Sequence, residues 1–115
     1  MAIALKEKGF AKHIIGVDKH AVHAEKALAL GLVDAVLPLQ EAVTQSDLVI
    51  LATPINAAET LLPQVLDMAD RQVVMDVGST KKMICASVAG HAKRGRFVAT
   101  HPMWGTEYSG PEAAV

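Results

Sequence analysis

The chain has 115 residues, which gives room for one domain with a modest core. Its net charge of -1 gives no reason to expect nucleic acid as a partner, and no apolar run approaches the ~20 residues of a membrane span. Hydrophobic residues make up 51% of the chain but aromatic residues only 3%, so the core is expected to be aliphatic. Such a core favours helices packed on a parallel sheet.

The first half of the chain alternates between helical and extended patterns. Glycines at the expected helix ends, Gly9 and Gly31, are typical C-terminal stops. In chain order we expect a helix over residues 2–8, a strand over Ile14–Val17, a helix over 20–30, a brief strand over 35–37 and one helical turn over 39–44.

The second half continues the alternation with longer apolar strands. We expect a strand over Leu48–Ala52, a helix over 56–69, a strand over Val73–Val77, a helix over 80–93 and a strand over Phe97–Ala99. Pro63 should kink or break the first of these helices, and Ser79 is a natural N-cap for the second. The three strands should be buried on both faces.

Polar residues follow the expected strands: Asp18, Thr53, Ser79 and His101. Alternating strands and helices imply right-handed βαβ units and a parallel sheet. Ligands of such sheets bind beyond the carboxyl ends of the strands. The pattern therefore predicts a binding site at this edge.

Asp18 ends the strand that would carry the acid of a dinucleotide-binding fold. There a carboxylate accepts hydrogen bonds from the adenosine ribose hydroxyls and repels a 2′-phosphate, which favours NAD over NADP. The alternative is that Asp18 only caps the next helix.

Ser79 lies in the segment Asp76-Val77-Gly78-Ser79-Thr80-Lys81, which lacks the first glycine and the spacing of a phosphate loop. A hydroxyl at this strand end would instead point into the cleft, or would serve as an N-cap and nothing more.

His101 follows a strand at a place where a hydride-transfer enzyme needs a proton acceptor, and its ordinary pKa suits that task. A lone loop histidine is more often structural. His20 and His23 could share a helix face, but without a third ligand we expect no metal there. Cys85 excludes an internal disulfide and fits a reducing cytoplasm.

The chain resembles the prephenate/arogenate dehydrogenases of tyrosine biosynthesis over nearly its whole length. Shared segments are Gly16–Asp18, Ala27 with Gly31–Asp34, Asp47–Pro54, Asp76–Lys81 and His101–Gly110. The first three occur in many nucleotide-binding dehydrogenases, whereas the last two, in this order and spacing, are specific to the family.

The resemblance implies a Rossmann-like doubly wound parallel sheet and NAD-dependent oxidative decarboxylation of prephenate or arogenate. It implies that His101 takes the proton of the ring hydroxyl and that Ser79 holds that hydroxyl in line. Thr53 and Pro54 would lie against the nicotinamide. Thr106 and Glu107 would border the substrate pocket, where Trp104 replaces an expected small residue.

The resemblance also implies parts that this sequence lacks. The first strand and glycine-rich loop are missing, as is the helical C-terminal domain through which the family forms homodimers, so residues 1–115 are expected to be a partial NAD-binding domain. Alone, the chain should self-associate or be marginally stable and bind NAD weakly. The alternatives are a non-catalytic fragment or interaction module, and another NAD-dependent hydroxy-acid dehydrogenase. The sequence does not separate prephenate from arogenate, nor show tyrosine inhibition.

Overall fold

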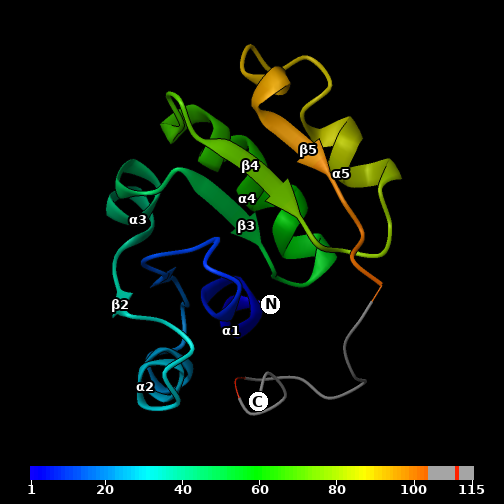
Figure 1. Ribbon diagram of the computed structural model, residues 1–115. Coiled ribbons are helices and arrows are strands. Elements are labelled where there is room, and N and C mark those ends of the chain that lie inside the picture. The colour runs from blue at the N-terminus through cyan, green and yellow to red at the C-terminus, as the bar shows by residue number, and fades with distance from the viewer. Residues whose placement is uncertain (104–110, 112–115) are drawn as a thin grey trace. The chain divides into compact units, whose positions relative to one another are not determined.

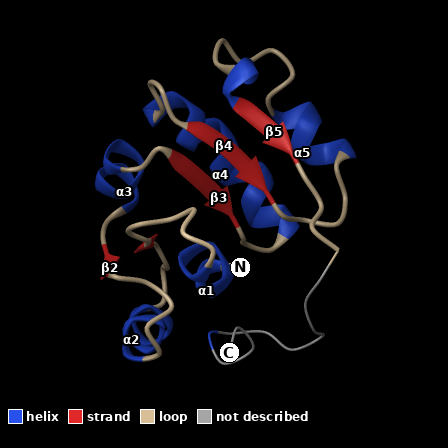
Figure 2. Ribbon diagram, in the orientation of Figure 1, coloured by secondary structure: helices blue, strands red, loops and turns tan. Residues whose placement is uncertain are grey.

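The computed structural model describes residues 1–103 and 111, and it divides the chain into two compact units. Among the described residues, unit 1 comprises Met1–Ala42 with Pro111, and unit 2 comprises Val43–Met103. Each unit contains its own parallel sheet with helices beside the strands (Figure 2). The predicted α/β class with parallel strands is confirmed.

Unit 1 is built from four short elements and the start of a fifth. They are helix α1 (Ala2–Glu7), strand β1 (Ile15–Gly16), helix α2 (Ala21–Ala29), strand β2 (Ala35–Val36) and helix α3 (Leu39–Gln45), in which unit 2 begins. Strand β1 pairs with β2 in parallel, with Ile15 opposite Ala35. The predicted order of elements is confirmed, with shorter strands.

Both predicted glycine stops are present. Gly9 and Gly31 have φ of 72° and 67°, in the left-handed region that favours glycine. After α2, the Gly31 amide donates to the Leu28 carbonyl and the Leu32 amide donates to the Ala27 carbonyl. This pair of bonds is a Schellman motif, so the glycine ends the helix by satisfying its last carbonyls.

Asp34 joins the N-terminal helix of unit 1 to its sheet. One carboxylate oxygen lies 2.6 Å from Lys6 Nζ, and the other accepts a 2.7 Å hydrogen bond from the Ile14 amide. His13 Nδ1 lies 3.8 Å from the same carboxylate. The hydrogen bond from Lys6, aided by that from Ile14, lowers the pKa of Asp34 below its usual value.

Replacing Asp34 with asparagine should therefore destabilise the chain in a pH-dependent way. A carboxylate whose pKa is lowered on folding stabilises the fold above its unfolded pKa, near 3.8, and loses that effect as the pH falls through the folded value. Wild type should exceed Asp34→Asn in unfolding free energy at neutral pH, and the difference should vanish in acid. Urea unfolding across pH measures it, with exposed Asp70→Asn as the control; a pH-independent difference would contradict the assignment.

Unit 2 is a three-stranded parallel sheet in the order β3-β4-β5 (Figure 1). Its elements are β3 (Leu48–Leu51), α4 (Ile55–Met68), β4 (Val73–Asp76), α5 (Lys82–Ser87), a 3-10 turn (Arg94–Arg96) and β5 (Phe97–Ala99). The strands end level with one another, because Leu51 is opposite Asp76 and Asp76 is opposite Ala99. All three strand predictions are confirmed to within a residue at each end.

The densest core of the described residues lies in unit 2. Its largest fully buried hydrophobic side chains are Val43, Leu62, Val65, Leu66, Val74, Ile84 and Val88. Helices α4 and α5 pack on each other and on the same face of the sheet (Figure 2). Helix α4 connects β3 to β4, and α5 lies in the connection from β4 to β5, so both connections run in the same direction across the sheet. Right-handed connections that run in the same direction lie on the same face of a sheet.

The expectation that these strands are buried on both faces is wrong for the described residues. Leu48, Val73 and Val98 lie on the same face of the sheet and are 45%, 42% and 50% exposed. The physical reason is the one-sided placement of α4 and α5, which leaves the second face of the sheet without a helix of unit 2.

Two predictions about the segment after β4 are corrected. The helix expected over 80–93 is confined to Lys82–Ser87, followed by turns and the 3-10 segment. Its N-cap is Lys81, so Ser79 is not the cap. Helix α4 runs unbroken through Pro63.

Within the described part of the chain, no helix combines the length and apolar character needed to cross a membrane.

Candidate active site at the strand ends of unit 2

Three of the predicted site residues follow the three strands of unit 2. Thr53 comes two residues after β3, Ser79 three residues after β4 and His101 two residues after β5. The strands are parallel and end level, so these residues share one edge of the sheet (Figure 1). Neighbouring strands are about 4.8 Å apart, which puts the three strand ends within roughly 10 Å.

The side chains at this edge are accessible to a ligand. Thr53, Pro54, Ser79 and His101 are all exposed. Pro54 is the N-cap residue of α4, and its fixed φ of -51° sets the direction in which the chain leaves β3. The arrangement offers two hydroxyls and one imidazole to a molecule that lies across the strand ends.

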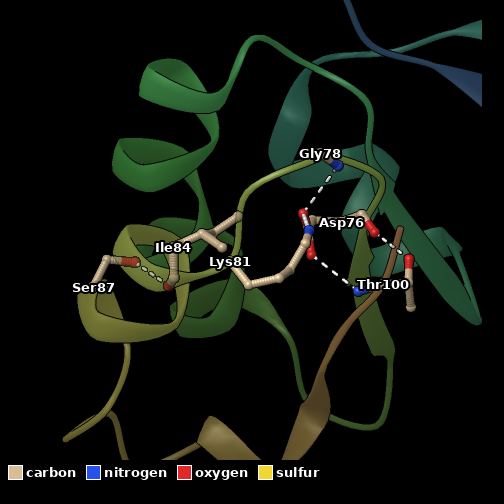
Figure 3. A network of polar contacts seen from close by, with 6 residues as sticks. All are labelled: Asp76, Gly78, Lys81, Ile84, Ser87 and Thr100. Carbon is tan, nitrogen blue, oxygen red and sulfur yellow. Dashed lines mark hydrogen bonds and ion pairs between the residues drawn. The ribbon is translucent and has the colours of Figure 1, made fainter. Parts of the chain in front are cut away.

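A buried carboxylate lies directly beneath this edge. Asp76, the last residue of β4, is 0% exposed. Its Oδ2 accepts a hydrogen bond of 3.0 Å from the Gly78 amide and forms an ion pair with Lys81 Nζ. Its Oδ1 accepts a bond of 3.3 Å from the Thr100 amide, and the Thr100 hydroxyl donates to the Asp76 carbonyl (Figure 3).

These contacts were not anticipated from the sequence. Asp76 and Lys81 enter the predictions only as the ends of the segment that carries Ser79, and Thr100 has no predicted role. The available signal was an acid at the end of an apolar strand with a lysine five residues later. An acid in that position is buried by the neighbouring strand and needs a counter-ion.

Asp18 belongs to unit 1 and lies beyond the end of β1. Its Oδ1 accepts a 2.8 Å hydrogen bond from the His20 amide, and its Oδ2 lies 3.6 Å from His23 Nδ1. His20 is the N-cap residue of α2, so Asp18 stabilises the turn into that helix without capping it. Among the described residues, Oδ1 accepts one hydrogen bond and Oδ2 has one neighbouring imidazole, so each oxygen has a lone pair left for a ligand.

Asp18 also borders an open hollow of about 400 Å³ at the carboxyl end of the unit 1 sheet. Lys19, Glu25 and Leu28 line it on the helical side, and Leu37 lines it beyond β2. A volume of this order suits a small organic ligand. Its border carries charged side chains of both signs, Asp18, Lys19 and Glu25.

The remaining predictions divide into two groups. Thr106 and Glu107, expected to border the substrate, lie outside the described residues, as does Trp104. His20 and His23 do lie together, with ring centroids 5.2 Å apart. No group of three or more potential metal ligands occurs among residues 1–103 and 111.

The fold and the strand-end residues define a nucleotide-binding domain of the Rossmann-like class. The family model described as "Prephenate dehydrogenase, nucleotide-binding domain" matches residues 1–115, and the chain belongs to this family. The family resemblance of the sequence is thereby confirmed.

Individual relatives agree. The chain is 31% identical over 118 residues to the prephenate dehydrogenase of Lactococcus lactis and 34% identical over 122 residues to that of Bacillus subtilis. Each match covers 99% of this chain but only 33% and 32% of the relative. The chain thus spans about a third of the length of these curated relatives.

Solved structures give the same result. The chain is similar to prephenate dehydrogenase from Aquifex aeolicus in complex with hydroxyphenyl propionate and NAD+, with a TM-score of 0.83 and 29% identity over 96% of this chain and 40% of that one. A prephenate dehydrogenase described as putative, from Corynebacterium glutamicum, matches with a TM-score of 0.81 and 27% identity over 97% of this chain and 35% of that chain.

Proposed function

We propose that the chain is part of an enzyme of tyrosine biosynthesis that oxidises and decarboxylates prephenate, or the related arogenate, with NAD. The observation that carries the proposal is the gathering of Thr53, Ser79 and His101 at the ends of three adjacent parallel strands. A structural relative holds NAD+ and hydroxyphenyl propionate, which has the aromatic ring that the reaction would form.

In this proposal His101 accepts the proton of the ring hydroxyl while the hydrogen on the same carbon leaves as hydride. The electrons of the carbon–carboxylate bond then enter the ring, carbon dioxide departs, and the phenolate oxygen regains a proton. Atoms and charge balance without an additional reactant. Aromatisation drives the reaction, so the protein chiefly orients the reacting groups.

Ser79 holds the ring hydroxyl in line with His101, and Thr53 and Pro54 lie against the nicotinamide. Thr106 and Glu107 border the substrate. When bound, NAD supplies the hydride-accepting ring. The proposal extends to a homodimeric enzyme of the cytoplasm, where the half-buried thiol of Cys85 stays reduced.

A substrate comparison tests this function. The complete natural polypeptide is expected to reduce NAD in the presence of prephenate or arogenate, releasing one carbon dioxide for each NADH. A non-aromatisable 2-hydroxy acid is the matched control and should give no NADH. NADH formed from the 2-hydroxy acid alone would reassign the chain to another class of dehydrogenase, and binding without turnover of any of them would refute catalysis.

Asp18 is the proposed determinant of cofactor choice. Asp18→Ser should lower the ratio of kcat/KM for NAD to that for NADP by roughly 10-fold or more, because loss of a charge-assisted hydrogen bond costs about 1.5–3 kcal/mol. The cationic Lys19 borders the same hollow and would favour a 2′-phosphate once the carboxylate is gone.

The control variant is Lys19→Ala, which removes the neighbouring cation but leaves the carboxylate. It should leave the preference for NAD intact. A wild-type enzyme that already prefers NADP would show that Asp18 does not read the ribose.

A further inference from the structure

Asp76 is a fully buried ionisable residue that the proposed chemistry does not use. Its side chain accepts or pairs with three groups, the Gly78 amide, the Lys81 ammonium and the Thr100 amide, and its carbonyl accepts from the Thr100 hydroxyl (Figure 3). Burial of an unpaired carboxylate is costly, so these partners are needed for its presence there.

The partners of Asp76 come from two different loops. Gly78 and Lys81 lie on either side of Ser79, in the segment between β4 and α5. Thr100 follows β5 and immediately precedes His101. One carboxylate therefore ties the loop that carries the Ser79 hydroxyl to the segment that carries the His101 imidazole, although Ser79 and His101 are 22 residues apart in sequence.

A carboxylate is the side chain that this position requires. Gly78, Lys81 and Thr100 all present N–H donors, and an ionised Asp offers only acceptors. Asparagine has the same shape but carries an NH₂ group, which would face one of those donors. A hydrophobic replacement would leave all of them without this acceptor.

The loop above Asp76 is also closely packed. A Cβ at Gly78 would lie 3.2 Å from Ile55 Cδ1 and 3.3 Å from Asp76 Oδ2. The absence of a side chain lets the Gly78 amide approach the carboxylate while Ile55 of α4 packs from the other side. The loop is thus held by a hydrogen bond, an ion pair and a steric fit.

We infer that Asp76 is a positioning residue: through Gly78, Lys81 and Thr100 it fixes Ser79 and His101 relative to each other. The inference rests on the proposed roles of those two residues. Displacement of a reacting group by about 1 Å can cost 10²-fold in rate, so a small rearrangement at Asp76 has a measurable consequence.

The test compares Asp76→Asn with wild type in the complete natural polypeptide. Hydrogen exchange at the Gly78 and Thr100 amides should accelerate at least about 10-fold, while exchange at Ile50 in β3 stays unchanged. With prephenate and NAD, kcat should fall by roughly 10²-fold, with little change in the KM for NAD. Asp67→Asn is the matched control: it removes the same charge from an exposed carboxylate in α4, paired with His91 at 2.9 Å.

A second variant covers the case in which Asp76→Asn does not fold. Thr100→Val removes only the hydroxyl that donates to the Asp76 carbonyl, and kcat should fall by up to about 10-fold, the scale of one hydrogen bond. Thr100→Ser keeps the hydroxyl and should restore the rate.

The outcomes separate this inference from the proposed function. Uniform acceleration of exchange across the sheet, or an unchanged kcat in an otherwise active enzyme, would overturn the role of Asp76 while leaving the function intact. An inactive wild type would refute the proposed function and, with it, the positioning of a catalytic pair.

Discussion

Replacing His101 with asparagine is expected to lower kcat of the natural enzyme by roughly 10²–10⁴-fold, the usual scale for loss of a general base. Asparagine keeps polarity at the end of β5 but cannot take up a proton near neutral pH. The KM for NAD should barely change, because His101 is proposed to face the substrate. Steady-state kinetics with prephenate as the varied substrate measure the effect.

The matched control is His13→Asn. His13 is a histidine of unit 1 whose side chain is 60% exposed beside Asp34, and it carries no part of the proposed chemistry. Its replacement should leave kcat within about twofold of the wild-type value, as expected for a surface substitution. A near-normal kcat for His101→Asn would remove this residue from the mechanism.

Replacing Leu66 with alanine should be among the most damaging single changes in the core. Leu66 is 0% exposed in α4, where that helix packs on the sheet and on α5. Deleting its side chain leaves a cavity and should lower the free energy of unfolding by about 2–5 kcal/mol. That is a large part of the ~5–15 kcal/mol that stabilises a typical protein.

Urea unfolding followed by circular dichroism measures this loss. Leu48→Ala is the control within the same unit, because it makes the same chemical change at a side chain that is 45% exposed on the sheet face opposite α4. It should cost less than about 1 kcal/mol. Equal losses for the two variants would show that the face bearing Leu48 is as tightly packed as the face beneath α4.

The helix ends and strands could be predicted because their causes are local. Gly9 and Gly31 adopt the left-handed conformation that their positions suggested. The apolar runs from Leu48 and Val73 form strands at the expected places. Within unit 2 the strands lie side by side in chain order, β3-β4-β5, as short right-handed βαβ connections require.

The errors arose where tertiary contacts override local preference. Ser79 has a good N-cap side chain, but α5 begins three residues later because the intervening loop is held to Asp76 through Gly78 and Lys81. The far end of the same expected helix gives way to turns at Val88–Gly90. Propensity alone cannot reveal a carboxylate that competes for these residues.

For the site, the positions at the strand ends could be predicted, whereas the contacts between distant residues could not. Positions such as Thr53 and His101 follow from the rule that the carboxyl ends of parallel strands share an edge. The bond from Thr100 to Asp76 joins residues 24 apart, and nothing in the local sequence of either specifies the other. The placement of Thr106 and Glu107 beside the substrate stays a prediction.

The most direct test of the account is to locate the bound ligands on the chain. Isotope-labelled natural polypeptide should be titrated with 4-hydroxyphenylpropionate in the presence of NAD and followed by amide and imidazole NMR signals. We expect the largest ligand-induced shifts at Thr53, at Gly78–Thr80 and at the His101 ring, and we expect the Asp18 signal to shift when NAD is added but not when 4-hydroxyphenylpropionate follows. Shifts that spare all three strand ends of unit 2 would contradict the account.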